Sequence, residues 1–280
     1  MTKIVTVIQA RSGSSRLPGK VMMEILGRSL LVRMVERVQR SALAGTIVVA
    51  TTTESSDDVI EKLCEAEGLL CYRGSQDDLL DRHYQVGKLY GADAVVKIPS
   101  DCPLIDPKVI DKVLQFYLDN TFDFVSNLHP ATYPDGNDVE VMSWPTIEKA
   151  WLEAKRTMER EHTTPYIWEN PELFKIGNVA WETGLDYSMS DRWTIDYPED
   201  FSFIKTIYEH LYPINPAFDL QDILHLTRQN PAIFAINHKY AGVNWYRNHL
   251  DELKTITEDK TKEAPSGSPK GGESIAGGII

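Results

Sequence analysis

Residues 3–20, "KIVTVIQARSGSSRLPGK", join a short apolar run to a basic, glycine-containing stretch. The apolar run, residues 3–10, is predicted to be a buried strand, and residues 11–20 a polar loop. Leucines and valines at helical spacing after Ser29 predict a helix directly behind the loop. A strand, a glycine-containing loop and a helix in succession are typical of an anion-binding site, because glycine exposes backbone N–H groups and a helix N-terminus favours negative charge.

The loop is unusually basic for its chain. Arg11, Arg16 and Lys20 lie within it, although the protein of 280 residues has a net charge of −12. Two familiar phosphate loops do not match: five residues separate Gly13 from Gly19, and Val21 follows Lys20, which excludes a Walker A motif. A G-x-G-x-x-G sequence is also missing from the chain. Three cations suit a triphosphate better than they suit the dinucleotide of that second motif.

The sequence that follows alternates between strand and helix patterns. Strands are predicted at 46–52, 69–73, 93–98 and 122–127, and helices at 57–68, 78–90 and 107–119. This alternation predicts an α/β fold with a mostly parallel, doubly wound sheet and helices on both faces. Ligands of such sheets bind outside the carboxyl ends of the strands. Polar stretches are expected at four such ends, at 9–20, 51–54, 73–78 and 99–106.

The second half of the chain is less regular. We expect a half-exposed strand at 138–143, a helix at 145–158, and a strand at 191–195 that runs into a helix at 199–211. Residues 1–250 are interpreted as one domain, with a first half of about 1–128 and a second of about 129–250. Residues 261–280 are rich in Gly, Ser and Pro and are predicted to be a disordered tail or a linker.

Composition narrows the class of protein. Hydrophobic residues make up 42% and charged residues 25%, as in an ordinary globular protein. The acidic balance argues against nucleic acid as a partner, which would require a basic face. Three cysteines without a C-x-x-C spacing favour reduced thiols and a cytoplasmic location. No stretch approaches the length of a membrane span, so no membrane association is expected.

The stretch "VIQARSGSSRLPGKVMMEILGRSLL" resembles the N-terminal signature of the cytidylyltransferases that activate sugar acids, such as CMP-Kdo and CMP-acylneuraminate synthetases. "VVATTTESSDD", "YRGSQDDLLDRH", "PSDCPLID", "DGNDVEV", "REHTTPYI" and "RWTIDYPEDF" extend the resemblance over about residues 3–245, with SpsF-type spore coat polysaccharide biosynthesis proteins closest. The resemblance implies a three-layer, Rossmann-like nucleotidyltransferase fold of the nucleotide-diphospho-sugar transferase type. It also implies CMP transfer from CTP to a sugar or sugar-acid acceptor, with release of pyrophosphate, in surface polysaccharide synthesis.

The resemblance assigns roles to residues of the first half. It implies that the nucleotide contacts Gln9, Ala10, Arg11, Ser12, Gly13, Arg16, Lys20, Thr51, Thr52, Arg73 and Ser100, with Arg11, Lys20 and Asp101 catalytic. The stretch 50–53, "ATTT", with Arg73 nearby, would border the pyrimidine, although a Thr run is also ordinary strand sequence.

Two aspartates are candidates for holding Mg²⁺. Asp101 follows the strand at 93–98, and Asp196 ends "RWTI" just before a helix; both match metal-binding aspartates of the family. Carboxylates holding a magnesium ion would neutralise the charge that grows as pyrophosphate leaves. The alternative is that both are turn or N-cap residues. Asp106, before Pro107, reads as a plain N-cap, and Asp200 as a cap or structural contact.

The acceptor is expected to bind to the second half. Candidates are Asn127, Asp138, Glu140, Arg160 and His162; Asp138 and Glu140 lie two residues apart on one face of a strand. The residues with which Kdo and sialic acid synthetases recognise a carboxylate have no match in this chain, so a sugar, a sugar acid and a polyol phosphate all stay open as acceptors. The resemblance also implies a homodimer through residues 130–190, whose aromatic side chains could equally form a local core.

Two other functions compete with the nucleotidyltransferase. A glycosyltransferase that uses a nucleotide sugar often holds its metal with Asp-x-Asp, which this sequence lacks. A regulatory nucleotide-binding module would need no pair of metal-binding aspartates, so Asp101 and Asp196 argue against it.

Overall fold

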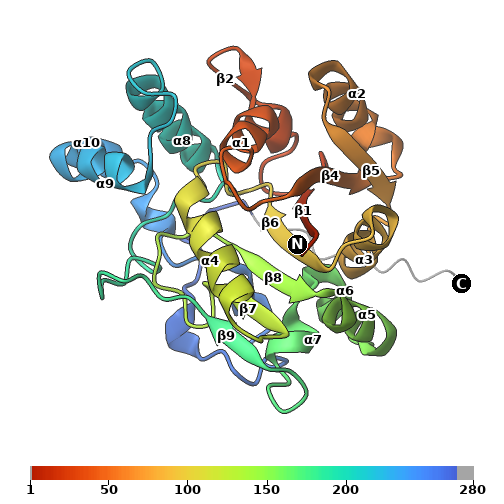
Figure 1. Cartoon of the computed structure of the whole chain (residues 1–280). Coiled ribbons are helices and arrows are strands. Elements are labelled where there is room, and N and C mark those ends of the chain that lie inside the picture. Colours follow the sequence, from red (N-terminus) through yellow and green to blue (C-terminus); the bar gives the residue numbers. More distant parts are fainter. Residues whose placement is uncertain (1, 270–280) are drawn as a thin grey trace, which may run out of the picture.

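A computed structural model of the chain describes residues 2–269. Its central element is a seven-stranded sheet of order β5-β4-β1-β6-β8-β7-β9 (Figure 1). These strands are β1 Ile4–Gln9, β4 Thr46–Thr52, β5 Leu70–Gly74, β6 Ala94–Pro99, β7 Phe124–Ser126, β8 Glu140–Ser143 and β9 Ile176–Asn178. A small second sheet pairs β2 (Glu24–Ile25) with β3 (Arg28–Ser29).

The sheet is parallel except at β8, which runs antiparallel to both β6 and β7. β1 pairs with β4 on one side and with β6 on the other. Along the chain, β4 and β5 are added on one side of β1, and β6 is then added on its other side. This reversal creates a topological switch point between β1 and β6. At such a point the loops after the two strands diverge and leave a crevice for a ligand.

Helices cover both faces of this sheet. The α-helices are α1 Leu30–Val38, α2 Asp58–Glu67, α3 Leu79–Tyr90, α4 Pro107–Asp119, α5 Trp144–Glu153, α6 Thr157–His162, α7 Pro165–Trp168, α8 Pro198–Leu211, α9 Leu220–Gln229 and α10 Pro231–Phe234. Short 3₁₀ turns are η1 Lys20–Met22, η2 Ser55–Asp57, η3 His238–Tyr240, η4 Trp245–Asn248 and η5 Glu258–Lys260. The side chains of Ser29, Asp78 and Asp106 cap α1, α3 and α4 by accepting from backbone N–H groups.

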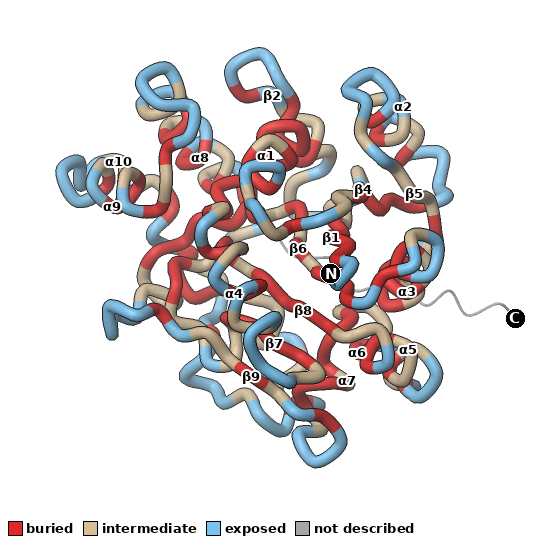
Figure 2. Tube along the Cα trace, in the orientation of Figure 1, coloured by how far each residue is buried: buried red, intermediate tan, exposed pale blue. Residues whose placement is uncertain are grey.

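The core follows from the alternation of side chains along the strands. Ile4 and Ile8 of β1 belong to an apolar cluster with residues of α1, α2 and α4. Val5 and Val7, one position along, belong to a second cluster with residues of α3 and α5. A third cluster unites α8 and α9 with Trp181 and Trp193. Figure 2 shows buried residues along the central strands and exposed residues on the outer turns of the helices.

The predicted three-layer α/β fold is confirmed, and the four polar stretches do follow β1, β4, β5 and β6. The second half differs from the prediction in places. The helix expected at 145–158 ends at Glu153, and α6 starts separately at Thr157. Residues 191–195 form only an isolated bridge between Arg192 and Asp135. The strand expected to be half-exposed is buried, because β8 lies inside the sheet between β6 and β7.

Residues 261–269 form no helix or strand. Lys262 N donates to Gly242 O, and Ala264 packs near Tyr197 and Tyr240. The rest of the predicted tail, residues 270–280, lies outside the described residues. Within the described part of the chain, no helix combines the length and apolar character needed to cross a membrane.

Candidate active site

A cleft of about 1760 Å³ opens at the carboxyl ends of β1 and β6. Gln9 and Ala10 at the end of β1, and Ser100 and Asp101 after β6, line one part of it. The two strand ends are tied together, since Ser100 N donates to Gln9 O at 3.2 Å. The cleft therefore occupies the switch point of the sheet.

The basic loop forms one wall of this cleft. Ser12 holds it to the start of α2, because its backbone N and its hydroxyl both donate to the Asp57 carboxylate, at 2.7 and 2.6 Å. The Gly19 N–H donates to Ser12 O at 2.9 Å and closes the loop. Gly19 has a φ of 68°, in the left-handed region that glycine adopts without strain. Arg11, Gly13, Arg16 and Lys20 line the cleft as a result.

Lys20 connects this loop to the two aspartates. Its Nζ donates to Ile195 O at 2.5 Å and lies 3.1 Å from Asp196 Oδ1 and 3.9 Å from Asp101 Oδ2. Arg16 contacts the same Asp196 oxygen at 2.6 Å. The loop cations and the two carboxylates, distant in sequence, thus meet at one end of the cleft.

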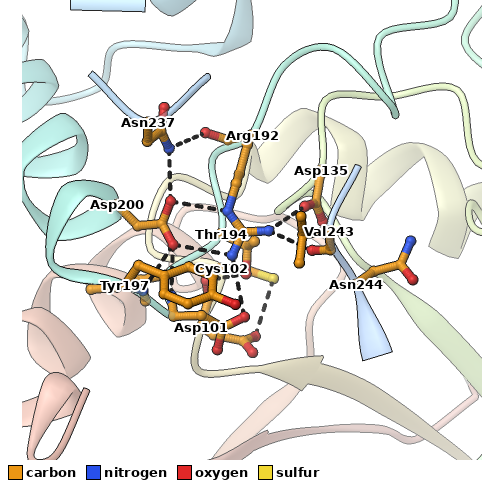
Figure 3. Close-up of polar contacts among 12 residues, drawn as sticks. Asp101, Cys102, Asp135, Arg192, Thr194, Tyr197, Asp200, Asn237, Val243 and Asn244 are labelled. Atoms are coloured by element: carbon orange, nitrogen blue, oxygen red, sulfur yellow. Dashed lines mark hydrogen bonds and ion pairs between the residues drawn. The ribbon is translucent and has the colours of Figure 1, made fainter. Parts of the chain in front are cut away.

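Arg192 fixes the position of Asp196. Figure 3 shows the Arg192 side chain between Asp200 and Asp135. This fully buried guanidinium contacts both Asp200 oxygens at 2.9 and 3.0 Å, Asp196 Oδ2 at 3.2 Å and Asp135 Oδ2 at 3.4 Å. Asp200 in turn accepts the backbone N–H groups of Asp196 and Tyr197, at 2.9 and 3.0 Å. Asp200 is therefore a structural cap of α8, as the sequence predicted, and it holds the Asp196 backbone in place.

Charges set the protonation of these carboxyl groups. Burial alone would raise the pKa of Asp196, but Lys20, Arg16 and Arg192 outweigh it and hold that pKa well below the ordinary value. Asp138 behaves in the opposite way: burial, reinforced by Asp101, raises its pKa to about 7. The cleft thus contains one carboxylate that stays ionised and one carboxyl group that exchanges its proton near neutrality.

The other end of the cleft is built by β6, β8 and the segment after them. The Lys97 ammonium on β6 contacts the Glu140 carboxylate on β8, and Thr164 Oγ1 donates to Glu140 at 2.6 Å. His162 lies nearby, stacked on Trp245 with ring centroids 3.8 Å apart. Burial lowers the pKa of His162 to about 3, so its imidazole is neutral at pH 7. This end combines neutral rings with one charged pair.

The family model for cytidylyltransferases matches residues 5–233. The chain belongs to the cytidylyltransferase family. It is 39% identical over 235 residues to an uncharacterized protein of Methanocaldococcus jannaschii, a match that covers 84% of this chain and 94% of that protein. It is 30% identical over 235 residues to the spore coat polysaccharide biosynthesis protein SpsF of Bacillus subtilis, covering 82% and 96%. A solved cytidylyltransferase from Leptospira borgpetersenii aligns with 33% identity and a TM-score of 0.78, over 84% of this chain and 97% of that one.

These matches confirm the resemblance that the sequence motifs carried, including its SpsF-type branch. The protein is therefore a nucleotidyltransferase of the cytidylyltransferase type. Its three layers, a seven-stranded sheet between two layers of helices, agree with the fold of the Leptospira enzyme.

Most predicted site residues of this cytidylyltransferase line the same cleft: Gln9, Ala10, Arg11, Gly13, Arg16, Lys20, Ser100, Asp101, Asn127, Asp138, Glu140, His162 and Asp196. Five others do not line it: Ser12, Thr51, Thr52, Arg73 and Arg160. Ser12 and Thr52 both donate to Asp57 beside the cleft. Arg73 extends toward Asp58 and Glu61 on α2. Arg160 contacts Asp78 Oδ2 and the Trp151 carbonyl.

Sequence reasoning missed several residues of the cleft. Lys97 interrupts the apolar run of β6, and a lysine inside a central strand was a usable signal. Arg82 on α3 is 4% exposed and lines the cleft, and burial, with Arg11 nearby, lowers its pKa to about 10. Trp245, Tyr246 and His249 come from the C-terminal segment, whose place at the cleft had no local signal in the sequence.

Proposed function

We propose that this cytidylyltransferase transfers CMP from CTP to an oxygen atom of a sugar-type acceptor, with Mg²⁺, in the synthesis of a surface polysaccharide or glycoconjugate. An acceptor oxygen would form a bond to the α-phosphorus, and the bond from that phosphorus to the β-phosphate oxygen would break. Pyrophosphate would leave with the electron pair. A hydroxyl acceptor would give its proton to a base, whereas the phosphate oxygen of a polyol phosphate is already ionised. The observation that carries this proposal is that Arg16 and Lys20 of the loop contact Asp196, and Lys20 also Asp101, at the switch point of the sheet.

The nucleotide would occupy the end of the cleft at β1. Arg11, Arg16 and Lys20 would bind the β- and γ-phosphates, with Gly13 contributing its backbone N–H and Ser100 its hydroxyl group. Two buried atoms support a polar ligand here: Gln9 Oε1 and Arg82 Nε have no hydrogen-bond partner among the described residues. A buried polar atom left unpaired costs about 1–3 kcal/mol, and a bound nucleotide would remove that cost.

Asp101 and Asp196 fit a magnesium site. Hard carboxylate oxygens are the ligands that Mg²⁺ prefers, and this ion usually completes its shell with phosphate oxygens and water, so two carboxylates suffice. Both lie within 4 Å of Lys20 Nζ, at 3.9 and 3.1 Å, and the Asp101 side chain is 35% exposed toward the cleft. Magnesium, when bound, would neutralise charge that develops on the transferred and departing phosphates. Lys20 and Arg16 would keep Asp196 ionised for this task.

The acceptor would occupy the other end, with Asp138, Glu140 and His162 as its polar partners. Asp138, whose pKa is about 7, would take the proton of the attacking hydroxyl. Asn127 would instead hold the backbone that carries Asp138. Its side-chain amide donates to Asn137 O at 2.7 Å and accepts from Val139 N at 3.0 Å. Arg160, with its contacts to Asp78, would position α6 and with it His162.

We also expect a homodimer, from the family resemblance, and a cytoplasmic location, from the three cysteines without a pairing pattern. Tyr133, Trp168 and Trp181 are buried, with exposed fractions of 4%, 4% and 5%, so they belong to the core rather than to a docking face. A dimer would therefore use other residues of 130–190. Light scattering that gives a monomer mass at micromolar concentration would reject it.

The test is pyrophosphate release from each nucleoside triphosphate with a panel of acceptors: sialic acid, 3-deoxy-manno-octulosonate, glucuronic acid and ribitol phosphate. We expect CTP to exceed UTP by about tenfold, because polar groups arranged for the cytosine amine would be left unpaired by uracil. ATP and GTP should barely react. Equal turnover of GTP and CTP would reject the choice of base, and release that needs a nucleotide sugar instead would favour a glycosyltransferase.

A further inference from the structure

The segment after α10 forms a strap along the cleft. We name residues 242–262 the C-terminal strap; it lies beyond residues 5–233, where the family model matches. Trp245, Tyr246 and His249 on this strap are among the residues that line the cleft. The strap thus adds to the site a wall that the family match does not include.

The base of the strap is tied to the residues around Asp196. Arg192, which contacts Asp196 and Asp200, also donates to Val243 O at 2.7 Å (Figure 3). The strap's two ends meet there, because Lys262 N donates to Gly242 O at 2.9 Å and Asn244 Nδ2 donates to Lys260 O at 2.8 Å. One buried guanidinium therefore positions both the proposed metal ligand and the strap.

The far part of the strap is docked on the segment around α7. Glu169, which is 3% exposed, accepts the N–H groups of Lys254 and Thr255, at 2.5 and 2.9 Å, and the Thr255 hydroxyl at 2.5 Å. Leu253 is buried in the apolar cluster beneath. A buried carboxylate with three donors is a strong anchor, so the strap is held both at its base and at its far part.

Between these anchors the strap presents aromatic rings. Trp245 stacks on His162 at 3.8 Å and 12°, with His249 edge-on at 5.8 Å. Trp245 and Tyr246 are half-buried, so part of each ring faces the cleft. On the floor of this end lies the Lys97–Glu140 ion pair. A flat ring beside charged hydrogen-bonding groups suits a ligand with one apolar face and a polar rim.

A pyranose ring has this chemistry, with C–H groups on one face and hydroxyl groups around its edge. We propose that the C-terminal strap forms part of the acceptor subsite, and that Trp245 is a specificity-determining residue on which the acceptor's sugar ring stacks. Lys97 and Glu140 then bind the hydroxyl or acidic groups at the edge of that ring. This inference rests on the proposed function, since it assigns a subsite for the acceptor of that reaction.

The test compares Trp245→Ala with the wild type in the full-length protein. CTP binding is measured by calorimetry with Mg²⁺, and the apparent KM for each acceptor of the panel by pyrophosphate release. We expect the KM for the acceptor to rise about five- to tenfold, the size of one lost ring stack, while CTP affinity stays unchanged. Trp245→Tyr, which keeps a stacking face, should recover most of the loss.

Two further variants guard against a general loss of structure. Glu169→Gln loosens the strap without touching the cleft and should raise the acceptor KM alone, whereas Lys254→Ala, an exposed strap residue, should change nothing. An unchanged acceptor KM in Trp245→Ala overturns the strap proposal while leaving the proposed function in place. Parallel losses of CTP affinity and melting temperature in Trp245→Ala and Glu169→Gln overturn it as well, because they indicate a structural role. A wild type that binds CTP but turns over no member of the panel contradicts the proposed function, and this inference with it.

Discussion

At the scale of single residues, Lys20 joins the basic loop to both candidate metal ligands. Its ammonium contacts Ile195 O, Asp196 and Asp101, at 2.5, 3.1 and 3.9 Å, and the proposed function adds the triphosphate to them. A charge-assisted hydrogen bond contributes about 1.5–3 kcal/mol. We therefore expect Lys20→Ala to raise the Kd for CTP by roughly tenfold to a hundredfold, as measured by calorimetry. Lys62→Ala, at an exposed lysine of α2, is the matched control. An unchanged affinity in Lys20→Ala would remove the loop from the site.

Asp138 predicts a dependence of stability on pH. Burial and Asp101 raise its pKa from the ordinary 3.8 to about 7. Between these two values the unfolded chain has lost the proton that the folded chain keeps, so stability falls as pH rises through this window. Asp138→Asn cannot ionise and does not suffer that loss. In metal-free buffer we expect the variant to melt higher than the wild type at pH 8, with the difference gone near pH 4. Identical melting temperatures at both pH values would contradict the shifted pKa.

At the scale of elements, the N-terminus of α8 depends on Arg192. Its buried guanidinium balances Asp200, Asp196 and Asp135 and also holds the base of the strap. Removing one partner of a buried ion pair leaves uncompensated charge, which costs about 3–5 kcal/mol. We expect Arg192→Ala to lower the free energy of unfolding by that amount in urea titrations.

The matched control is Lys239→Ala. Lys239, on η3, forms an ion pair with Glu199 in the first turn of α8, and the lysine side chain is 51% exposed. Exposed ion pairs contribute about 0–1 kcal/mol, so Lys239→Ala should hardly change the free energy of unfolding. If Arg192→Ala unfolded no more easily than Lys239→Ala, the buried network would not hold α8 in place.

At the scale of the whole molecule, the sequence pattern predicted those elements whose apolar residues recur at the period of a helix or a strand. The alternation of strands and helices up to residue 128 predicted the parallel part of the sheet, because each element there has its own apolar periodicity. The polar loops at the ends of β1 and β6 then fell at the switch point, since topology alone brings those ends together. Lys20 and Asp101 line one cleft for that reason, whereas Asp196 reaches it through a tertiary contact, in which Ile195 N donates to Asp101 O.

Tertiary pairing decided the parts that pattern could not predict. The alternating sequence of β8 read as half-exposed, yet Glu140 is buried because its partner, Lys97, lies on the neighbouring strand β6. β9 is three residues long and gave no periodic signal. The strap's place at the cleft depends on Glu169 and Arg192, distant in sequence from the residues that they hold.

A direct role of Asp101 in the transfer of CMP can be tested with a single rate. It is the rate of pyrophosphate release from CTP and Mg²⁺, with an acceptor that the wild type uses, in Asp101→Asn. Asp101 is 35% exposed and has Lys20 as its ion-pair partner at 3.9 Å, so the fold should tolerate the change. Because the variant loses several kcal/mol of charge stabilisation, we expect its rate to be lower by about a thousandfold or more, with the melting temperature preserved. The control is Asp251→Asn, at an exposed residue of the strap, which should stay fully active. A near-normal rate in Asp101→Asn would exclude Asp101 from the reaction and from binding the metal.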